Sequence, residues 1–240
     1  MRRKQTAMVT VLLLSGVIVF FPPVYSQPDE SLLPVILIHG YRQDASVWET
    51  WEELLEADGI PYLSITFTQS DDDCGSARDH ATELGEKVQE FLTQTGMQQL
   101  NLVGFSKGGI DARVYLQGGT DDVANLIMIG TPNAGSPLAE MYNDVGCMPA
   151  ATDLRPGSAA TRARENMNTD YHTISGDWRY WYFWMLMEGN LEIEGPDDGW
   201  VPVSSVESLR YSDTLGQTSS YHTDLLGSEE YGLAREVLAR

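Results

Sequence analysis

The sequence is poor in basic residues. Its 240 residues include 15 Lys and Arg against 35 Asp and Glu, which gives a formal net charge of −20 at pH 7. A surface with this charge repels the phosphate backbone of nucleic acids and the anionic head groups of membranes. We therefore expect no nucleic-acid partner, and we attribute the acidity to general solubility rather than to a specific cationic partner.

Cysteine is almost absent, since only Cys74 and Cys147 occur. Zinc sites draw on closely spaced ligand pairs, which two isolated cysteines do not supply, so we expect no zinc site. In an oxidising compartment an isolated pair of cysteines is more often bridged than free. The sequence therefore predicts a disulfide between them.

A long hydrophobic run is also missing. The most apolar segment, residues 7–21, follows three basic residues and is shorter than the ~20 residues that a membrane-spanning helix needs. Small residues before Gln27 fit a cleavage site. We predict a signal peptide over residues 1–26 and a secreted domain over 27–240; the alternative is an uncleaved N-terminal segment that anchors the protein in a membrane.

Apolar runs of strand length alternate with segments of helical period along the first half of the domain. Strands are predicted at 33–38, 60–67, 100–103 and 123–129, and helices at 46–57, 76–95 and 107–117, with a last helix from about 228. Runs this apolar are typical of parallel strands that are covered on both faces. We predict one α/β domain with a mostly parallel central sheet and helices on both faces.

The alternation stops after the fourth strand. A segment rich in Gly, Pro, Ala and Asn comes first, then a short strand-like piece at 171–175, and then the most aromatic stretch of the chain at 178–187. We predict a lid-like insertion over about residues 131–190. The aromatic stretch is either a buried packing element or an apolar wall for a substrate, with Trp181 and Trp184 as candidate substrate-binding residues.

The segment Gly104-Phe-Ser-Lys-Gly-Gly109 carries the sharpest local signal. A G-x-S-x-G pattern occurs by chance in many proteins, but here it directly follows an apolar strand and directly precedes a helical segment. In a turn this tight the flanking residues must lack side-chain bulk, and the serine is pushed above the sheet. We predict that Ser106 is a nucleophile.

A serine nucleophile needs a general base, and the sequence has only four histidines. His222 lies late in the chain, in a polar segment over 216–224. In enzymes whose serine stands in a strand-to-helix turn of this kind, the nucleophile comes first in the chain, the acid second and the base last. His39 belongs to the loop after the first strand. We expect His80 at the surface of a helix, and His172 in core packing or a cross-strand hydrogen bond.

The acid that orients the histidine should lie between the serine and the histidine in the sequence. Asp198, in the segment Asp-Gly-Trp-Val-Pro, is the best placed. Asp197, its neighbour, and Asp177, which follows the strand-like piece, remain alternatives. We expect Asp224 to bond locally.

Attack of a serine on a carbonyl creates a negative oxygen, which backbone N–H groups can stabilise. Donors come from the residue after the nucleophile, here Lys107, and from the loop after the first strand, where we assign Tyr41. We expect the ammonium group of Lys107 to lie in solvent. Phe105, next to the nucleophile, is a further candidate substrate-binding residue.

Together these motifs resemble the secreted bacterial triacylglycerol lipases and their esterase relatives. The segments that carry the resemblance are Val35-Ile-Leu-Ile-His-Gly40, Asn101-Leu-Val-Gly-Phe-Ser-Lys-Gly-Gly109, Ile129-Gly-Thr-Pro-Asn-Ala-Gly-Ser136, Asp198-Gly-Trp-Val-Pro202 and the late His222. The resemblance implies an α/β-hydrolase fold, a catalytic triad of Ser106, Asp198 and His222, oxyanion donors at Tyr41 and Lys107, and no required cofactor.

The implied activity is hydrolysis of a carboxylic ester or lipid substrate through an acyl-enzyme, with transient contact at a lipid–water interface. The alternatives are a polyester depolymerase, thioesterase or acyltransferase with the same triad, or a non-catalytic binding module of the same fold. Many relatives have His or Gln where Phe105 and Lys107 stand, which leaves the substrate preference open. Some relatives hold a structural calcium, and Asp177 and Asp224 stand near the corresponding places. Two positions do not make a calcium cage, so a structural calcium is left open but not favoured.

Overall fold

The computed structural model describes residues 32–68, 74–141, 147–178 and 193–240. The predicted signal peptide and the candidate residues Trp181 and Trp184 lie outside the described residues. Within the described ranges, no helix is both long and apolar enough to cross a membrane.

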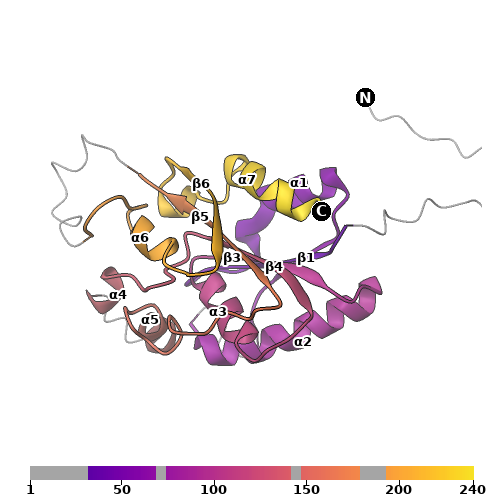
Figure 1. The fold of residues 1–240 in the computed structure, drawn as a ribbon, viewed down its shortest axis with the longest axis horizontal. Helices are drawn as coiled ribbons and strands as arrows, with labels where there is room; N and C mark the ends of the chain where they lie inside the picture. The colour runs from indigo at the N-terminus through magenta and orange to yellow at the C-terminus, as the bar shows by residue number, and fades with distance from the viewer. Residues whose placement is uncertain (1–31, 69–73, 142–146, 179–192) are drawn as a thin grey trace, which may run out of the picture. The chain divides into compact units, whose positions relative to one another are not determined.

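Six parallel strands form one sheet in the order β2-β1-β3-β4-β5-β6 (Figure 1). The strands are β1 (Val35–Ile38), β2 (Tyr62–Ile65), β3 (Leu100–Phe105), β4 (Val123–Ile129), β5 (Asp170–Gly176) and β6 (Ser212–Thr218). The predicted parallel sheet is confirmed. The carboxyl ends of these strands meet at one edge of the sheet, where open α/β sheets bind their ligands.

The helices cover both faces of the sheet, with α1 and α7 on one face and α2 and α3 on the other (Figure 1). The described helices are η1 (Ala45–Trp48), α1 (Glu49–Asp58), α2 (Ala77–Thr95), α3 (Lys107–Leu116), α4 (Leu138–Met141), α5 (Met148–Asp153), α6 (Val203–Val206), η4 (His222–Asp224) and α7 (Ser228–Leu238). The Ser76 side chain caps α2 by accepting a hydrogen bond from the Asp79 N–H, and Gly96 ends the helix with a φ of 71°.

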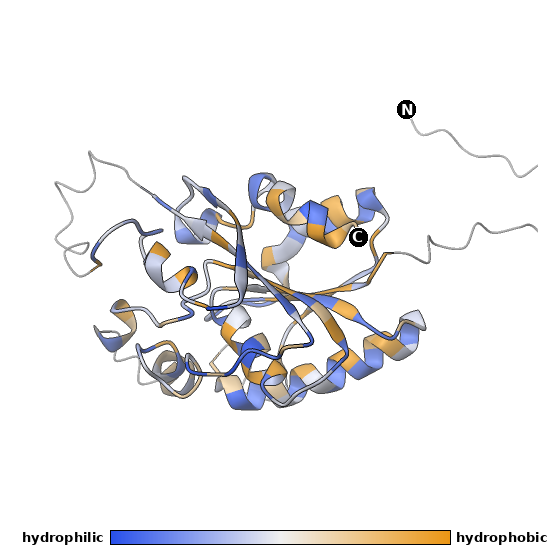
Figure 2. Ribbon diagram, in the orientation of Figure 1, coloured by the Kyte–Doolittle hydropathy of each residue, from blue (hydrophilic) through white to orange (hydrophobic). Residues whose placement is uncertain are grey.

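Alternate residues of each central strand pack into two separate cores. On β1, Val35 and Leu37 join the core under α1 and α7, whereas Ile36 and Ile38 join the core under α2 and α3. All four side chains are fully buried, which is why the strand is a continuous apolar run. The helices turn their apolar residues towards the sheet and their polar residues outwards (Figure 2).

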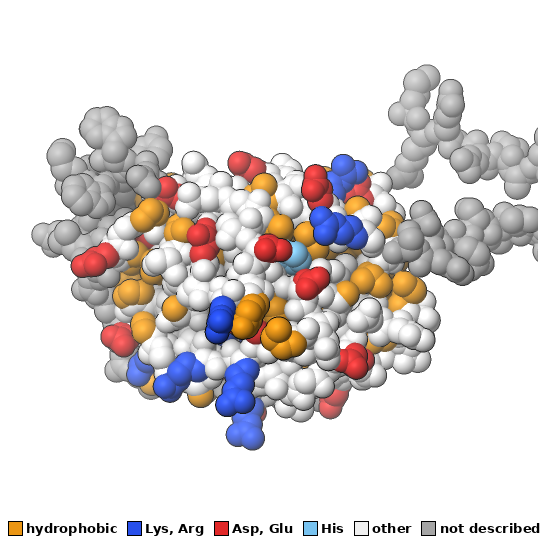
Figure 3. All heavy atoms as spheres, in the orientation of Figure 1, with side chains coloured by type: hydrophobic (Ala, Val, Ile, Leu, Met, Phe, Trp, Pro, Cys, Tyr) orange, Lys and Arg blue, Asp and Glu red, His pale blue; other side chains and the backbone are white. Residues whose placement is uncertain are grey.

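Acidic side chains are dispersed over the face of the molecule drawn in Figure 3 and do not gather in one patch there. Lys and Arg side chains also lie on this face, so both signs of charge are present there. A surface with charges of both signs favours solubility.

Strand β6 differs from the expectation, because residues 216–224 have the composition of a polar loop. In the structure Gly216 to Thr218 belong to this strand, which pairs with β5 at one end of the sheet. Most of the residues of β6 are partly or fully exposed and few of them are apolar. A search for apolar runs does not detect such an edge strand.

Two short helices, α4 and α5, occupy the segment between β4 and β5. Because β5 is itself a strand of the sheet, it divides the predicted insertion over 131–190 into two connections. The Cys74–Cys147 disulfide joins the segment before α2 to the start of α5, with the two Cα atoms 4.8 Å apart. The Asp153 carboxylate at the end of α5 accepts a hydrogen bond of 2.6 Å from the Ala77 N–H. These two links attach α5 to the N-terminal end of α2.

Helix α3 lies in unusually close contact with the end of β1. A Cβ atom at Gly108, in the first turn of α3, would overlap the carbonyl oxygens of Ile38 and His39. These are backbone atoms of a central strand and its adjoining loop, and they cannot move aside as a flexible side chain would. The absence of a side chain at Gly108 is therefore what lets α3 begin where it does.

Replacing Gly108 by alanine should lower the free energy of unfolding by about 1–3 kcal/mol or more, because the added methyl group can be accommodated only by shifting backbone. The matched control is Gly232→Ala in the exposed interior of α7, where a Cβ would meet no atom within 4 Å. That substitution should be neutral or stabilising by up to ~1 kcal/mol, since alanine favours a helix. Urea unfolding measures both, and equal effects of the two substitutions would contradict the close contact.

The disulfide closes a loop with a sequence separation of 73 residues. Replacing both cysteines by serine should lower the free energy of unfolding by roughly 4 kcal/mol, since the bridge restricts the unfolded chain. Titration of the unfolded wild-type protein should find no free thiol without reductant and two after reduction. Two reactive thiols per chain before reduction would show that the bridge is absent.

Candidate active site

Ser106 stands in the tight turn between β3 and α3. Its φ of 50° and ψ of −117° are strained for a residue with a side chain. The turn has no room at Gly104, where a Cβ would collide with the backbone of Gly109. A hydrogen bond of 2.8 Å from the Ser106 N–H to the Ile129 carbonyl fastens the turn to β4. The Ser106 hydroxyl is therefore presented at the carboxyl end of the sheet.

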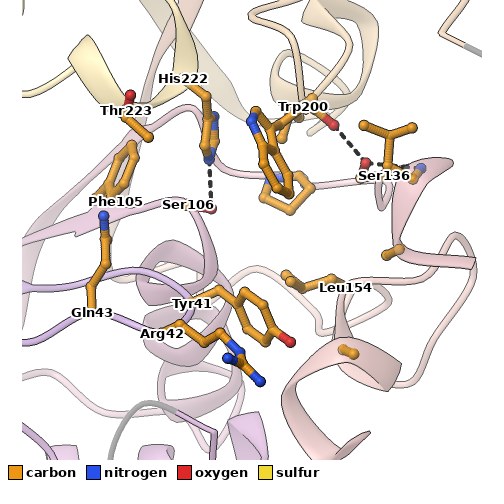
Figure 4. Close-up of a pocket in the computed structure, with 15 residues that line it drawn as sticks. Tyr41, Arg42, Gln43, Phe105, Ser106, Ser136, Leu154, Trp200, His222 and Thr223 are labelled. Atoms are coloured by element: carbon orange, nitrogen blue, oxygen red, sulfur yellow. Dashed lines mark hydrogen bonds between the residues drawn. The ribbon is translucent and has the colours of Figure 1, made fainter. Parts of the chain in front are cut away.

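His222 brings its imidazole to the serine from the turn that follows β6. Its Nε2 atom lies 2.9 Å from Ser106 Oγ. The Phe105 ring lies against the imidazole with a centroid separation of 5.0 Å. A Cβ atom at Gly130 would lie 3.2 Å from two atoms of the imidazole, so the absence of a side chain there lets the backbone pack directly against the ring. These neighbours restrict the imidazole to the orientation that faces Ser106 (Figure 4).

Asp198 is the carboxylate that lies within hydrogen-bond distance of the other imidazole nitrogen. Its Oδ2 lies 2.6 Å from His222 Nδ1, and its Oδ1 accepts hydrogen bonds from the N–H groups of Trp200 and Val201, at 2.9 and 2.7 Å. The side chain is fully buried. Because a carboxylate can only accept, this geometry assigns the proton to Nδ1 and leaves Nε2 free to take the serine proton.

The neighbouring candidate Asp197 has a different partner. Its Oδ1 accepts a hydrogen bond of 2.7 Å from the Gly199 N–H. Burial raises the pKa of Asp197, and the adjacent carboxylates of Asp198 and Asp177 add to the rise, although the Gly199 bond opposes it. The structure thus separates the two adjacent aspartates, one shaping the turn and the other facing the histidine.

The two predicted oxyanion loops meet beside Ser106. Lys107 is the first residue of α3, so its N–H has no acceptor within the helix. Gly40 lies so close that a Cβ there would be 3.1 Å from Ser106 Cβ, and its N–H donates to Gln43 Oε1 at 3.0 Å. The Tyr41 side chain borders the space in front of Ser106 (Figure 4).

Ser106 opens into a pocket with a volume of about 320 Å³. The pocket is lined by Tyr41, Arg42, Gln43, Phe105, Ser106, Pro132, Ser136, Leu138, Ala139, Ala151, Leu154, Trp200, Val201, His222 and Thr223. The volume lies within the range of small-molecule sites. The aliphatic residues Leu138 and Ala139 of α4, Ala151 of α5 and Leu154, directly after α5, line the pocket. Trp200 lies beside His222 (Figure 4). The predicted candidate Phe105 lies in this lining.

Two of the remaining histidines occupy the kind of place expected for them. His39 is buried in the loop after β1, and its Nδ1 lies 2.9 Å from the Gly40 carbonyl oxygen. Burial lowers the pKa of His39, although the bond to Gly40 opposes this. His172 forms the cross-strand contact that was predicted, since its Nε2 lies 3.2 Å from Asn125 Oδ1 on β4.

The expectations for His80 and for the Lys107 side chain were wrong. Both side chains are 1% exposed, and Asp111 of α3 bridges them. Its carboxylate lies 2.7 Å from Lys107 Nζ and 2.9 Å from His80 Nδ1. Asp111 is not among the predicted site residues, although its spacing of four residues from Lys107 on one helix is a usable signal. The burial of His80 could not be predicted from the sequence of α2, because its partner Asp111 lies on α3.

Among the residues that the structure describes, no group of three or more His, Cys, Asp or Glu side chains is arranged to hold a metal ion. Asp177 and Asp224, the two positions considered for calcium, are both described by the structure and belong to no such group.

Comparison with known proteins identifies relatives of the chain. A triacylglycerol lipase of Pseudarthrobacter phenanthrenivorans is 32% identical over 120 residues, which cover 47% of this chain and 37% of that protein. A triacylglycerol lipase of Burkholderia plantarii is also 32% identical over 120 residues, covering 47% of this chain and 33% of that protein. The match thus spans about a third of the length of these curated relatives. The predicted resemblance to bacterial triacylglycerol lipases is confirmed.

Solved structures with the same fold include the mature form of Bacillus licheniformis lipase BlEst2. It superposes with a TM-score of 0.73 at 22% identity, covering 89% of this chain and 94% of that one. Phospholipase PlaB from Legionella pneumophila, solved in complex with thio-NAD, superposes with a TM-score of 0.59 at 17% identity over 73% of this chain and 44% of that one. At these identities the likeness concerns the fold, and it confirms the α/β-hydrolase fold.

A family model provides the remaining comparison. The model of the palmitoyl protein thioesterases matches residues 34–178, which is more than half of the chain and includes β1 to β5 with the serine turn. The chain belongs to the palmitoyl protein thioesterase family.

Proposed function

We propose that this protein hydrolyses carboxylic esters of apolar acyl groups, with Ser106 as nucleophile, His222 as general base and Asp198 as the acid that orients the base. The observation that carries the proposal is the pair of short contacts from Ser106 Oγ to His222 Nε2, 2.9 Å, and from His222 Nδ1 to Asp198 Oδ2, 2.6 Å. The Ser106 hydroxyl, at the end of these two contacts, opens into the apolar pocket. A nucleophile, a base within hydrogen-bond reach and a third group that orients the base are the arrangement that acyl transfer requires.

In the acylation step, Ser106 Oγ attacks the carbonyl carbon of the ester while its proton passes to His222 Nε2. The carbonyl oxygen becomes negative in the tetrahedral intermediate, and in this proposal the backbone N–H groups of Lys107 and Tyr41 donate to it. His222 then gives the proton to the leaving alcohol as the carbon–oxygen bond breaks. An acyl group remains on Ser106.

In the deacylation step, a water molecule takes the place of the alcohol and His222 removes one of its protons. The resulting hydroxide attacks the acyl carbon, and the same N–H groups again stabilise the negative oxygen. The proton returns from His222 to Ser106 Oγ, and the carboxylic acid is released. Asp198, fixed by the N–H groups of Trp200 and Val201, stabilises the protonated imidazole in both steps.

The lining of the pocket supports an apolar acyl group as the bound part of the substrate. Leu138, Ala139, Ala151, Leu154 and Val201 all face the cavity. Each methylene group that such a wall removes from water contributes ~0.8 kcal/mol, or about a fourfold change in affinity. The triacylglycerol lipases that share sequence with this chain agree with an acyl substrate.

Thioester hydrolysis is the second candidate, and the match to the palmitoyl protein thioesterase family favours it. The same triad and acyl pocket would serve, because the two reactions share the acyl-enzyme and differ only in the group that leaves. A pair of substrates with the same acyl chain, one an oxygen ester and one a thioester, would separate the two candidates.

An oxidising compartment suits this protein, since the Cys74–Cys147 bridge would be reduced in a cytosol. The disulfide and the bacterial lipase relatives support an extracellular location, with the N-terminal segment over 1–26 as the proposed export signal.

Replacing Ser106 by alanine should lower kcat by about 10⁴-fold or more on every substrate, because the nucleophile is lost while packing is not. His222→Ala should be about as damaging, and the double variant no worse, since the two residues act as one unit. The control is Ser208→Ala, which removes an exposed hydroxyl elsewhere. Steady-state hydrolysis of a matched oxygen ester and thioester measures all four variants, and substantial activity of the Ser106 variant would exclude the proposed nucleophile.

Replacing Ala151 by phenylalanine should fill the acyl pocket, because this buried residue of α5 lines it. We expect kcat/KM to fall tenfold or more for an octanoate ester and by less than about threefold for an acetate ester, which needs little of the pocket. Thr152→Phe places the same ring on the exposed side of α5 and should leave the ratio unchanged. Equal proportional losses on both esters would mean that this pocket does not hold the acyl chain.

A further inference from the structure

A chain of buried side chains lies beneath the serine turn and takes no part in the mechanism above. Lys107, Asp111 and His80 are each 1% exposed, and the Asp111 carboxylate joins the other two at 2.7 and 2.9 Å. The Phe67 ring stacks on His80 with centroids 3.9 Å apart, and it meets His39 edge-on at 5.4 Å. This row of five side chains, from His39 to Lys107, is named here the buried relay.

The buried relay joins the two loops that are proposed to hold the oxyanion. One end is Lys107, whose backbone N–H is one proposed donor. The other end is His39, whose Nδ1 lies 2.9 Å from the carbonyl oxygen of Gly40, immediately before the second proposed donor, Tyr41. The relay also crosses from α3 to α2 and on to the segment after β2. It thus links elements that no single helix could hold together.

Stability alone does not account for an ion pair at this depth. Burial raises the pKa of Asp111, but Lys107 and His80 outweigh burial and hold the pKa below its usual value. Removing two charges from water is costly, and apolar residues of the same volume often serve equally well or better. The relay therefore calls for an explanation in terms of what it positions.

The position of Lys107 supplies that explanation. The residue directly follows Ser106, and its side chain is absent from the lining of the described pocket, so it does not reach the substrate there. Lys107 Nζ donates a hydrogen bond to the carboxylate of Asp111, which lies four residues further along α3. The other oxygen of that carboxylate contacts Nδ1 of His80, on α2. Lys107 Nζ also lies 3.0 Å from His80 Nδ1, so the side chain is anchored at its far end on a second helix as well as on its own. This anchoring restricts the rotation of the Lys107 backbone N–H.

We propose that Lys107, Asp111 and His80 are positioning residues, which fix the first turn of α3 so that the Lys107 N–H points at the oxyanion. The inference rests on the proposed function. Neither a proton nor a covalent bond passes through the relay. Its effect is confined to the transition state, because the ground-state carbonyl makes weaker use of the same donors.

The test replaces the pair as a whole, in the double variant Lys107→Met/Asp111→Asn. Met and Asn are close in volume to Lys and Asp, so the variant retains the side-chain volume and removes both charges together. It also leaves His80 Nδ1 an amide partner in place of the carboxylate and keeps the backbone N–H of residue 107 in place. We expect kcat to fall by between about tenfold and a hundredfold, which is less than the loss of a whole donor, with KM changed by less than about threefold. The control is Val88→Ala, a cavity in the buried face of α2 two turns beyond His80, which should lower the melting temperature without changing kcat.

A trifluoromethyl ketone provides the readout that a purely structural role would not change. Ser106 Oγ adds to its carbonyl carbon, its proton passes to His222, and the oxygen becomes an oxyanion held by the same donors. We expect the inhibition constant of the double variant to rise by the same factor by which kcat/KM falls. A folded double variant whose kcat and inhibition constant stay within threefold of the wild-type values would overturn the positioning role.

His80→Phe is the second variant, and it decides the question if the double variant does not fold. It preserves the stacking on Phe67 but removes the nitrogen that holds Asp111. We expect kcat to fall and the ketone inhibition constant to rise, both by at least about threefold; unchanged values would overturn the proposal. A wild-type protein that neither hydrolyses esters or thioesters nor binds the ketone would overturn the proposed function together with the inference, which distinguishes that result from failure of the relay alone.

Discussion

The contact between Gly108 and the backbone at the end of β1 is the constraint on which the site depends. Because no side chain intervenes, α3 begins directly against the sheet, and the chain must reverse at Ser106 with a positive φ. That reversal lifts the hydroxyl out of the sheet and turns the first N–H groups of α3 towards the same space. The positions of the proposed nucleophile and of one proposed oxyanion donor therefore follow from one packing requirement.

The other half of the site depends on connections from the far side of the sheet. Asp198 lies between β5 and β6, and His222 follows β6. Because parallel strands end at the same edge of the sheet, His222 reaches Ser106 and Asp198 reaches His222. A backbone hydrogen bond of 2.9 Å from the His222 N–H to the Asp198 carbonyl fixes their spacing independently of the side chains. Across the pocket, α5 is tied to α2 by the disulfide and by Asp153. The proposed reacting groups and the apolar wall of the pocket are thus supported by separate parts of the fold.

Sequence reasoning succeeded where a local pattern has one physical cause. Buried parallel strands must be apolar, and a tight strand-to-helix turn must have glycines around its serine, so the sheet and the position of Ser106 could be predicted. The order of the chain then favoured His222 as the base and Asp198 as the acid, with Asp197 and Asp177 left as alternatives. The structure brings Asp198 and His222 within hydrogen-bond distance of one another. Reasoning failed where burial depends on a partner elsewhere. Neither Lys107 nor His80 has an apolar neighbourhood in the sequence, and only the packing of α2 on α3 encloses them.

The missed strand β6 has a consequence for the behaviour of the protein in solution. A strand at the end of a sheet leaves backbone N–H and carbonyl groups on one side, and these can pair with a strand of another molecule. In β6, Ser212, Asp213 and Thr214 provide a polar and partly charged sequence, with the latter two exposed. A charged side chain on such a strand opposes its pairing with the edge of another sheet. The polar composition of β6, which gives no apolar run in the sequence, thus also protects the protein against aggregation.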